Sequence, residues 1–512
     1  MWRIQATPCL WKKSAMSGGP PGPQPTPSSA SVSRALEQPD RGSGAGEGAR
    51  PTMMITLALA LGLSGCLVGP NYHRPATSLP VEFPGAAATK ESIADKKWFE
   101  LFQDATLKQL VETALQKNFD VQIAAQRVLE ARAQYGITRA NLFPTLDAQG
   151  SFTASRSSSI GSFPFITPGT NLATSYTQAG LQFAWELDLW GRLRRLDEAA
   201  RAQYLASEEA RNGVLISLIS DVMTTYFEVR ELDLELEIGQ HNYDIARDNL
   251  RLIQERKDRG AANGLEVHQA EQFLYTTTAE IASVQRSIAQ AEDALNFLLA
   301  NAPTEVPRGQ ALEQITSAPN LPAGLPSSLL ERRPDIRQAE DNLIAANAQI
   351  GAARALFFPD ISLTGLLGSQ SRSLAGMFSG PARTESIAAN ALLPIFHAGL
   401  RAGVQLTEAQ EREMLLTYRK SIYGALREVA DALATHTRTR EQRGEEEKLV
   451  KALSESVRLS NLRYRGGLDS YLQVLDSERN LFAGQLTLAQ LRLLELQSVV
   501  QLYRALGGGW QS

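Results

Sequence analysis

The side chains that most often carry chemistry in proteins are few in this sequence and are not grouped. The chain of 512 residues has only two Cys and five His, and its net charge is −4. Two cysteines cannot complete a four-ligand zinc site, and His268 and His397 are both isolated. No serine stands in an order typical of a Ser-His-Asp triad, and Gly507 to Gly509 precede no helix that could hold a phosphate. We therefore expect no catalytic residue, no metal site and no nucleic-acid partner.

Cys66 is the one cysteine whose surroundings indicate a specific modification. The apolar run from Ile55 to Leu63 has the length of the hydrophobic region of a signal peptide, and the small residues Ser64 and Gly65 separate it from the cysteine. This arrangement is similar to a bacterial lipobox. The resemblance implies cleavage before Cys66, a covalent lipid on its sulfur and new amino group in place of any cofactor, and sorting to the outer membrane. A buried core cysteine is the alternative interpretation.

The residues before the lipobox are not expected to fold. Residues 17–52 are rich in Pro, Gly, Ser and Ala, a composition that cannot bury enough apolar surface to order itself. We therefore interpret 1–65 as a disordered extension and lipoprotein signal peptide, with Met53, Met54 or an upstream residue as the start. Residues 66–97 then form a lipidated N-terminal arm.

Proline placement and an internal repeat indicate how the rest of the chain is organised. No Pro lies in 169–302 or in 395–512, so both stretches can form very long helices, in whose interior a proline costs about 3 kcal/mol. The segment from Arg139 to Pro144 recurs as Arg354 to Pro359, 215 residues later. We therefore predict a tandem duplication. Its parts are a first repeat at 98–301, a Pro-rich connector at 302–334, a second repeat at 335–506 and a tail at 507–512.

Each repeat is expected to contribute two β-strands with one apolar and one polar face. Apolar and polar residues alternate over about 144–156 and 175–189, and again over about 359–368 and 384–396. A half-buried sheet in a soluble domain would explain any one of these strands. Four strands of membrane-crossing length behind a lipobox instead favour a transmembrane β-barrel. Because four strands cannot close a barrel, the chain must oligomerise, and a trimer leaves room for a channel whereas a dimer does not.

A long helical hairpin follows the strands in each repeat. The first is predicted at about 192–299 and the second at about 400–506, with glycine-containing turns near 260–264 and 466–467. At 1.5 Å per residue, the first helix of each hairpin reaches roughly 100 Å, which no globular core requires. A coiled-coil rod in a periplasmic adaptor or a structural lipoprotein is the alternative. That alternative predicts a soluble product once Cys66 is replaced.

Five motifs carry a resemblance to a known family. They are, in chain order, Gly69 to Tyr72 with Arg74-Pro75, Trp185 to Leu193, Leu330 to Ile336, Phe357 to Pro359, and Arg463 to Gly467 leading into Tyr471 to Asp476. With these motifs in this order, the chain resembles the TolC-like outer-membrane efflux factors of the lipoprotein branch. The resemblance implies an α+β membrane protein that assembles as a homotrimer. Its four transmembrane strands per chain form a 12-stranded β-barrel, and its helical hairpins form a 12-helix periplasmic α-barrel.

The same resemblance implies a transport protein that makes and breaks no bond. The protein would be the outer-membrane exit duct of a tripartite efflux system, anchored in outer-membrane lipid and extending into the periplasm. Its partners would be a periplasmic adaptor protein and an inner-membrane pump of the resistance-nodulation-division class. The sequence does not identify the exported substrate, the pump or the adaptor.

The turn of the second hairpin contains a candidate gate. Leu472 and Asp476 lie four residues apart, on one face of the return helix. Threefold symmetry would turn them into one apolar and one anionic ring, and such rings resist leakage and attract cations, respectively. The resemblance implies the same role, because the family has its periplasmic constriction at matching positions.

A lock beside the gate is also implied by the resemblance. Tyr464 and Arg465 match the residues with which the family holds neighbouring hairpins together in the closed state. Glu266 and Asp258, at the equivalent turn of the first repeat, are expected as partners of Arg465. For all of these residues, an ordinary solvated helix end is the alternative interpretation.

Overall fold

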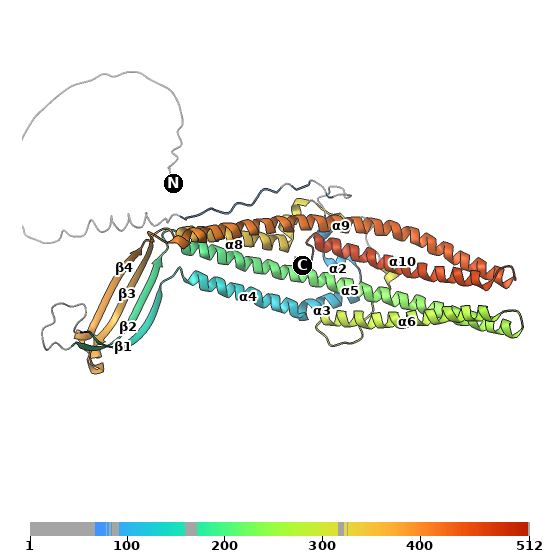
Figure 1. Ribbon diagram of the computed structural model, residues 1–512, viewed down its shortest axis with the longest axis horizontal. Coiled ribbons are helices and arrows are strands. Elements are labelled where there is room, and N and C mark those ends of the chain that lie inside the picture. Colours follow the sequence, from blue (N-terminus) through green and yellow to red (C-terminus); the bar gives the residue numbers. More distant parts are fainter. Residues whose placement is uncertain are drawn as a thin grey trace, which may run out of the picture. The chain divides into compact units, whose positions relative to one another are not determined.

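The structure is a computed structural model, and it describes residues 67–77, 79–80, 83, 92–158, 172–315, 322–324 and 326–509. The predicted signal peptide and Cys66 lie outside the described residues. Helices and strands follow one another as labelled in Figure 1. They are α2 (Trp98–Leu101), α3 (Ala105–Lys117), α4 (Phe119–Ala140), β1 (Thr145–Arg156), β2 (Ala173–Leu187), α5 (Arg192–Asp258), α6 (Gly264–Leu298), α7 (Leu329–Arg332), α8 (Pro334–Ala355), β3 (Asp360–Ser371), β4 (Arg383–Leu392), α9 (Ala398–Arg465) and α10 (Tyr471–Ala505). Short 3-10 helices lie at Ile93–Asp95, Leu312–Gln314, Pro326–Ser328, Leu374–Phe378 and Gly380–Ala382.

The two halves of the chain repeat the same order of elements. A helix of 22 residues, α4 or α8, leads into two strands, and the two helices begin 215 residues apart at Phe119 and Pro334. A long helix and a return helix of 35 residues follow, and the return helices begin 207 residues apart at Gly264 and Tyr471. The prediction of four strands and two long helical hairpins is therefore confirmed.

The four strands form one antiparallel sheet in the order β1-β2-β3-β4. Consecutive strands are neighbours, so β1 and β4 each keep one edge without a partner strand among the described residues. One predicted boundary was wrong. The fourth strand was expected to reach residue 396, but β4 ends at Leu392, because Pro394 has no N–H for the ladder and the chain turns there into α9.

Two strands approach each other closely at a pair of glycines. Gly180 of β2 lies opposite Gly368 of β3. A Cβ atom on Gly368 would lie 2.3 Å from the backbone oxygen of Ala179, and one on Gly180 would lie 2.7 Å from that of Leu367. Only glycine fits at such contacts, because the backbones of β2 and β3 lie too close at this point to leave room for a side chain between them.

Substituting alanine at Gly368 is therefore expected to weaken the sheet. The added methyl group forces β2 and β3 apart, at a cost of about 1 to 3 kcal/mol. The temperature at which the purified, assembled protein dissociates should fall. Gly150→Ala in β1 is the matched control, since a Cβ atom there meets nothing within 4 Å. Equal dissociation temperatures for the two variants would contradict the close approach.

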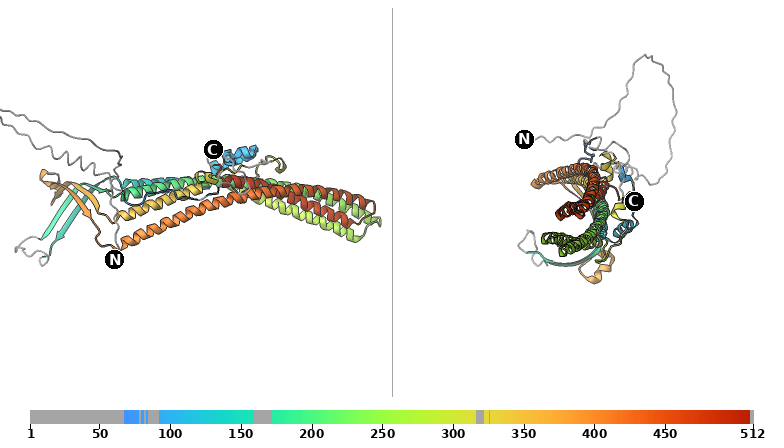
Figure 2. Two further views of the ribbon diagram at one scale, coloured as in Figure 1. Left: turned by 90° about the horizontal axis from the view of Figure 1, so that it is seen from above. Right: turned by 90° about the vertical axis from the view of Figure 1, so that its right-hand side faces the viewer.

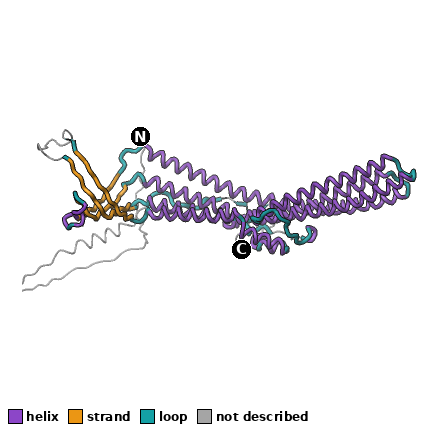
Figure 3. The backbone as a smooth tube through the Cα atoms, turned by 90° about the horizontal axis from the view of Figure 1, so that it is seen from below, coloured by secondary structure: helices purple, strands orange, loops and turns teal. Residues whose placement is uncertain are grey.

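The helices pack side by side from the strands to the two hairpin turns. Helix α5 packs against α4, α6, α8 and α10, and α9 packs against α8 and α10. Figure 2 shows α5, α10 and α9 as neighbours when the helices are viewed end-on, and Figure 3 shows the purple helices continuing to the turns that join them. None of the described helices combines the length and apolar character that a membrane span requires.

The main core lies where the short helices and the connector cover the long ones. Trp98, Val111, Phe227, Leu312 and Leu502 belong to one buried cluster drawn from α2, α3, α5, the connector and α10. Polar contacts tie the same elements together. Asp104 begins α3 by accepting hydrogen bonds from Thr106 N and Leu107 N, and its second oxygen accepts from the Tyr226 hydroxyl of α5 at 2.6 Å.

Each repeat joins the end of its return helix to the start of its short helix with one side chain. The Asn118 amide, at the start of α4, donates to the Leu298 carbonyl at the end of α6 at 2.9 Å. At the equivalent position of the second repeat, the Arg333 guanidinium donates to the Ala505 carbonyl at the end of α10 at 2.8 Å. These bonds satisfy carbonyls that a helix end leaves without a partner.

Candidate channel and gate

The sheet has one apolar and one polar face. Residues paired across the strands lie on the same face, so the register assigns each side chain to a face. The apolar face carries Leu146, Ala148, Phe152, Leu181, Phe183, Trp185, Leu187, Ile361, Leu363, Leu367, Ile387, Ala389 and Ala391, and at its end far from the helices also the polar Thr177, Arg383 and Glu385. The polar face carries Asp147, Gln149, Ser151, Thr153, Gln178, Gln182, Glu186, Ser362, Thr364, Gln370, Ser386 and Asn390. This is the pattern of a strand between lipid and water.

Tryptophans fix the strands to the helices. The Trp185 indole donates to the Leu142 carbonyl at 3.1 Å, at the end of α4. The Trp190 indole donates to the Pro359 carbonyl at 2.8 Å and stacks on Phe358 with ring centroids 4.8 Å apart. The first bond joins β2 to the segment that leads into β1. The second joins the connection between β2 and α5 to the segment that leads into β3. Specific contacts therefore fix the orientation of the sheet on the helices.

The start of α5 is held by two carboxylates of the same motif. Asp188 accepts hydrogen bonds from Leu193 N and Arg194 N, which caps the helix after Gly191 turns the chain at φ +78°. Glu186 accepts three hydrogen bonds from the Arg192 guanidinium, the shortest at 2.5 Å. The motif from Trp185 to Leu193 is therefore the joint between strand and helix.

The N-terminal arm lies along α5 and α8 and reaches this joint. Val68 N donates to the Trp190 carbonyl at 3.1 Å, and the buried Arg195 side chain donates to Asn71 at 2.8 Å. Further along the arm, both Tyr72 and Arg74 donate to Glu340 of α8, which is buried.

The first described residue of the arm lies at the joint itself. A Cβ atom on Gly191 would lie 3.1 Å from the Leu67 side chain. Leu67 follows Cys66 directly. The structure therefore holds the neighbour of the predicted lipidation site at the level where the strands meet the helices.

Leu472 and Asp476 lie together on one uncovered face of α10. Leu472 is 55% exposed and Asp476 is exposed, with a 3.3 Å hydrogen bond from Asn480. The opposite face of the same helix is buried through Tyr471 and Leu475, which pack against the first hairpin. The two predicted gate residues thus lie on the same side of α10, near the turn. Neither of them packs against the first hairpin.

Tyr464 joins the two hairpins of one chain near their turns. Its ring is buried, lies 5.6 Å from the Tyr471 ring, and has the Arg256 guanidinium of α5 at 4.6 Å. Burial raises the pKa of Tyr464, although Arg256 acts to lower it. Its hydroxyl is buried and has no hydrogen-bond partner within the described chain. Sequence reasoning did not find Arg256, because its contact depends on the register between α5 and α9.

The other predicted lock residues are not brought together within one chain. Arg465 and Asp258 are exposed, and no ion pair between them occurs in the described part of the structure. Glu266 instead accepts a 3.2 Å hydrogen bond from Asn263, the residue that caps α6. Next to Arg465, Arg463 pairs with Asp469 across the turn at 2.5 Å. Pairing of Arg465 with Glu266 or Asp258 stays a prediction.

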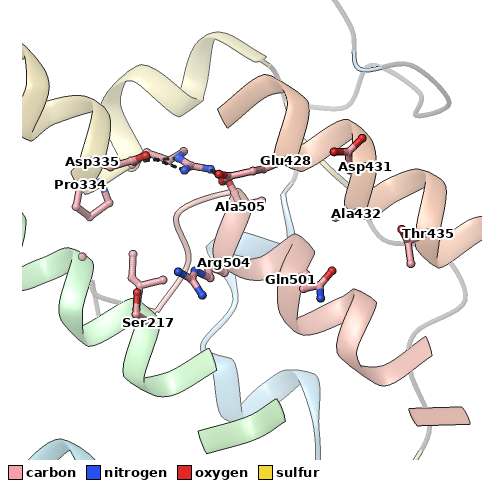
Figure 4. A pocket seen from close by; sticks show the side chains of 13 residues that line it. Ser217, Pro334, Asp335, Glu428, Asp431, Ala432, Thr435, Gln501, Arg504 and Ala505 are labelled. Atoms are coloured by element: carbon pink, nitrogen blue, oxygen red, sulfur yellow. Dashed lines mark hydrogen bonds and ion pairs between the residues drawn. The ribbon is translucent and has the colours of Figure 1, made fainter. Parts of the chain in front are cut away.

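One further cavity lies between α5, α8, α9 and α10, at the junction made by Arg333. It encloses about 440 Å³, and its lining includes Ser217, Glu428, Gln501 and Arg504. Figure 4 shows Asp335 and Glu428 with the ion pairs that neutralise the arginine at this junction. The same described ranges contain no group of three His, Cys, Asp or Glu side chains that could hold a metal ion.

Comparison with known proteins assigns a family to this fold. A family model described as "Outer membrane efflux protein" matches residues 110–301 and 325–508, which is most of the chain. The chain belongs to this family. The outer membrane efflux proteins are channels, so the prediction of a transport protein rather than an enzyme is confirmed.

Relatives of this outer membrane efflux protein align over nearly their whole length. The chain is 42% identical to the solvent efflux pump outer membrane protein SrpC of Pseudomonas putida, over 88% of this chain and 97% of the relative. It is 34% identical to the cation efflux system protein CusC of Escherichia coli K12, over 90% of this chain and 100% of the relative.

Solved structures of the family share the fold. The open state of the Neisseria gonorrhoeae MtrE outer membrane channel is similar with a TM-score of 0.78 and 32% identity, over 87% of this chain and 99% of that one. A membrane protein from Pseudomonas aeruginosa is similar with a TM-score of 0.81 and 34% identity, over 86% and 100%. This chain is thus an outer membrane efflux channel that extends into the periplasm and works with a pump. The alternative of a coiled-coil adaptor or structural lipoprotein was wrong.

Proposed function

We propose that three copies of this chain form the exit duct of a tripartite efflux system. The observation that carries the proposal is the four-stranded sheet, which has one apolar face, one polar face and two edges that no described strand of the chain pairs with. An open edge in lipid leaves backbone groups unpaired at several kcal/mol each, so β1 of one copy must pair with β4 of the next. Three copies give 12 strands and a polar, water-filled lumen.

The helical hairpins extend this lumen and close it at their turns. Leu472 and Asp476 lie on the uncovered face of α10, and threefold symmetry would make them two rings at the narrow end. Tyr464, together with Arg465 and its acidic partners Glu266 and Asp258 on a neighbouring copy, holds the hairpins in the closed arrangement. The same turns are the docking site for a periplasmic adaptor, behind which an inner-membrane pump of the resistance-nodulation-division class selects the substrate.

A lipid anchor on Cys66 completes the assembly. The arm holds Leu67 at the joint between strands and helices, so a lipid on the preceding residue enters the membrane at the level where the barrel ends. Two or more acyl chains anchor a protein stably. The intact mass of the purified protein tests for cleavage before Cys66 and for the added acyl groups.

The duct is tested by single-channel conductance of the purified protein in planar bilayers. The native protein is expected to conduct weakly. Asp476→Ala should change its preference for cations, and Leu472→Gly should raise the current, because each removes one ring from the narrow end. Glu445→Gln on an exposed turn of α9 is the control, since it changes a carboxylate that only pairs with Lys448. The proposal is wrong if native mass spectrometry finds a monomer, or if none of these proteins gives a current.

A further inference from the structure

The two hairpins of one chain meet along a polar seam between α5 and α10. Three contacts form it: Glu235 with Gln490 at 3.1 Å, Asn242 with Gln485 at 3.4 Å, and Asn249 with Glu478 at 2.8 Å. The α5 members are spaced by seven residues, which is the spacing of the core positions of a coiled coil. In such cores, isolated polar residues fix the register of the helices at a cost in stability.

Glu478 is the member of the seam nearest to the gate. It follows Asp476 by two residues on α10 and points the other way, with only 4% of its surface exposed. Its Oε1 atom accepts the hydrogen bond from Asn249 on the first hairpin. Its Oε2 atom is buried and has no hydrogen-bond partner of normal geometry among the described residues. A buried carboxylate that is only half satisfied is costly and calls for an explanation.

Among the described residues, the side chains that act on the Glu478 carboxylate are two neutral amides, Asn249 on α5 and Asn461 on α9. Its titratable neighbour on the same helix is Tyr471, on which the Arg479 guanidinium also acts. Burial raises the pKa of Glu478 above its ordinary value, although both amides act to lower it. One turn before Glu235 on α5, burial together with Glu235 raises the pKa of Glu231 to about 8. The seam therefore holds protons more tightly when its helices are packed than when water reaches it.

We propose that Glu478 is a positioning residue of the gate: its contact with Asn249 fixes α10 against the first hairpin, so that Leu472 and Asp476 stay on the open face, and ionisation of this buried carboxylate favours parting of the seam, because water solvates the charge better than the neighbouring amides do. This inference rests on the proposed duct. The sign follows from linkage. The packed seam binds the proton more tightly than the parted seam, so low pH favours the closed arrangement, and a rise of pH through the raised pKa favours opening.

The test is the pH profile of single-channel conductance, measured between about pH 5 and pH 8. The native protein should conduct more as pH rises. The ratio of open to closed channels should increase by on the order of tenfold for each pH unit by which the pKa of Glu478 lies above its ordinary value. Glu478→Gln keeps the shape and the acceptor for Asn249 but cannot ionise. It should remain closed, with this part of the pH dependence removed. Asn249→Ala removes the other partner and should raise conductance across the whole range.

Two controls separate this proposal from a general effect of the seam and from failure of the duct. Glu231→Gln neutralises a buried carboxylate of α5 that lies one turn before the seam, and it should leave the response of Glu478 in place. An unchanged pH profile in Glu478→Gln, or the same loss in both variants, overturns the proposal. If Leu472→Gly still raises the current when either of these results is found, the duct stands and only the role of Glu478 is wrong.

Discussion

Tyr464→Ala is expected to raise the conductance of the assembled protein more than other single changes at the hairpin turns. The ring is 94% buried between the two hairpins, against Tyr471 and beneath the Arg256 guanidinium. Removing a buried aromatic side chain costs about 3 to 5 kcal/mol. A difference of about 5.5 kcal/mol moves a two-state equilibrium from 1:99 to 99:1, and a loss of about 3 to 5 kcal/mol covers more than half of that shift, which opens a closed gate for most of the time. Single-channel recording in planar bilayers measures it.

Tyr464→Phe is the matched control for this prediction. Because the Tyr464 hydroxyl has no hydrogen-bond partner within its own described chain, phenylalanine keeps every contact of the ring that the structure shows. We therefore expect the Phe variant to stay closed. If it opens like the Ala variant, the hydroxyl must bond to a neighbouring copy, and the ring packing is not what holds the tip. If neither variant opens, the assignment of Tyr464 to the lock is wrong.

The strands could be predicted because their chemistry repeats every second residue. Alternation placed Leu181 and Trp185 on one face and Gln182 and Glu186 on the other, and the register of the sheet confirms both sets. The end of β4 could not be predicted from alternation, because apolar residues continue past Pro394 while backbone pairing does not. A pattern of side chains reports which face is apolar, and it does not report where the hydrogen-bonded ladder stops.

The contacts at the hairpin turns depend on register, which the sequence does not contain. The seven-residue spacing of Glu235, Asn242 and Asn249 is visible in the sequence, yet it predicts only a stripe on α5. The partners on α10 lie more than 200 residues away along the chain, and a shift by one turn would pair them differently. For the same reason Arg256 was missed, and Arg465 was assigned to partners that the structure does not place beside it within one chain.

Arg333→Ala is expected to destabilise the protein more than any other change of an arginine beside the connector. The side chain is buried at the point where α10 ends and α8 begins. It donates to the Ala505 carbonyl and pairs with both Asp335 and Glu428. Its charge also opposes the negative end of the α10 dipole. Because Asp335 and Glu428 are themselves half exposed, their charges stay solvated after the change. The loss is then mainly an unpaired carbonyl and lost packing, about 2 to 4 kcal/mol.

Arg332→Ala is the comparison that makes this prediction specific, because it removes the same side chain one position earlier. Arg332 pairs with Asp95 at the surface, and such pairs contribute about 0 to 1 kcal/mol. Arg333→Lys tests geometry as well as charge, since an ammonium cannot donate to Asp335 and Ala505 through a planar fork and should recover only part of the loss. The thermal midpoint of the helical circular dichroism signal should fall in the order Arg332→Ala, Arg333→Lys, Arg333→Ala. Equal midpoints for the two alanine variants would contradict the prediction. They would show that the apolar core alone stabilises the junction between α8 and α10, and that Arg333, which takes the position of Asn118 in the first repeat, has no structural role.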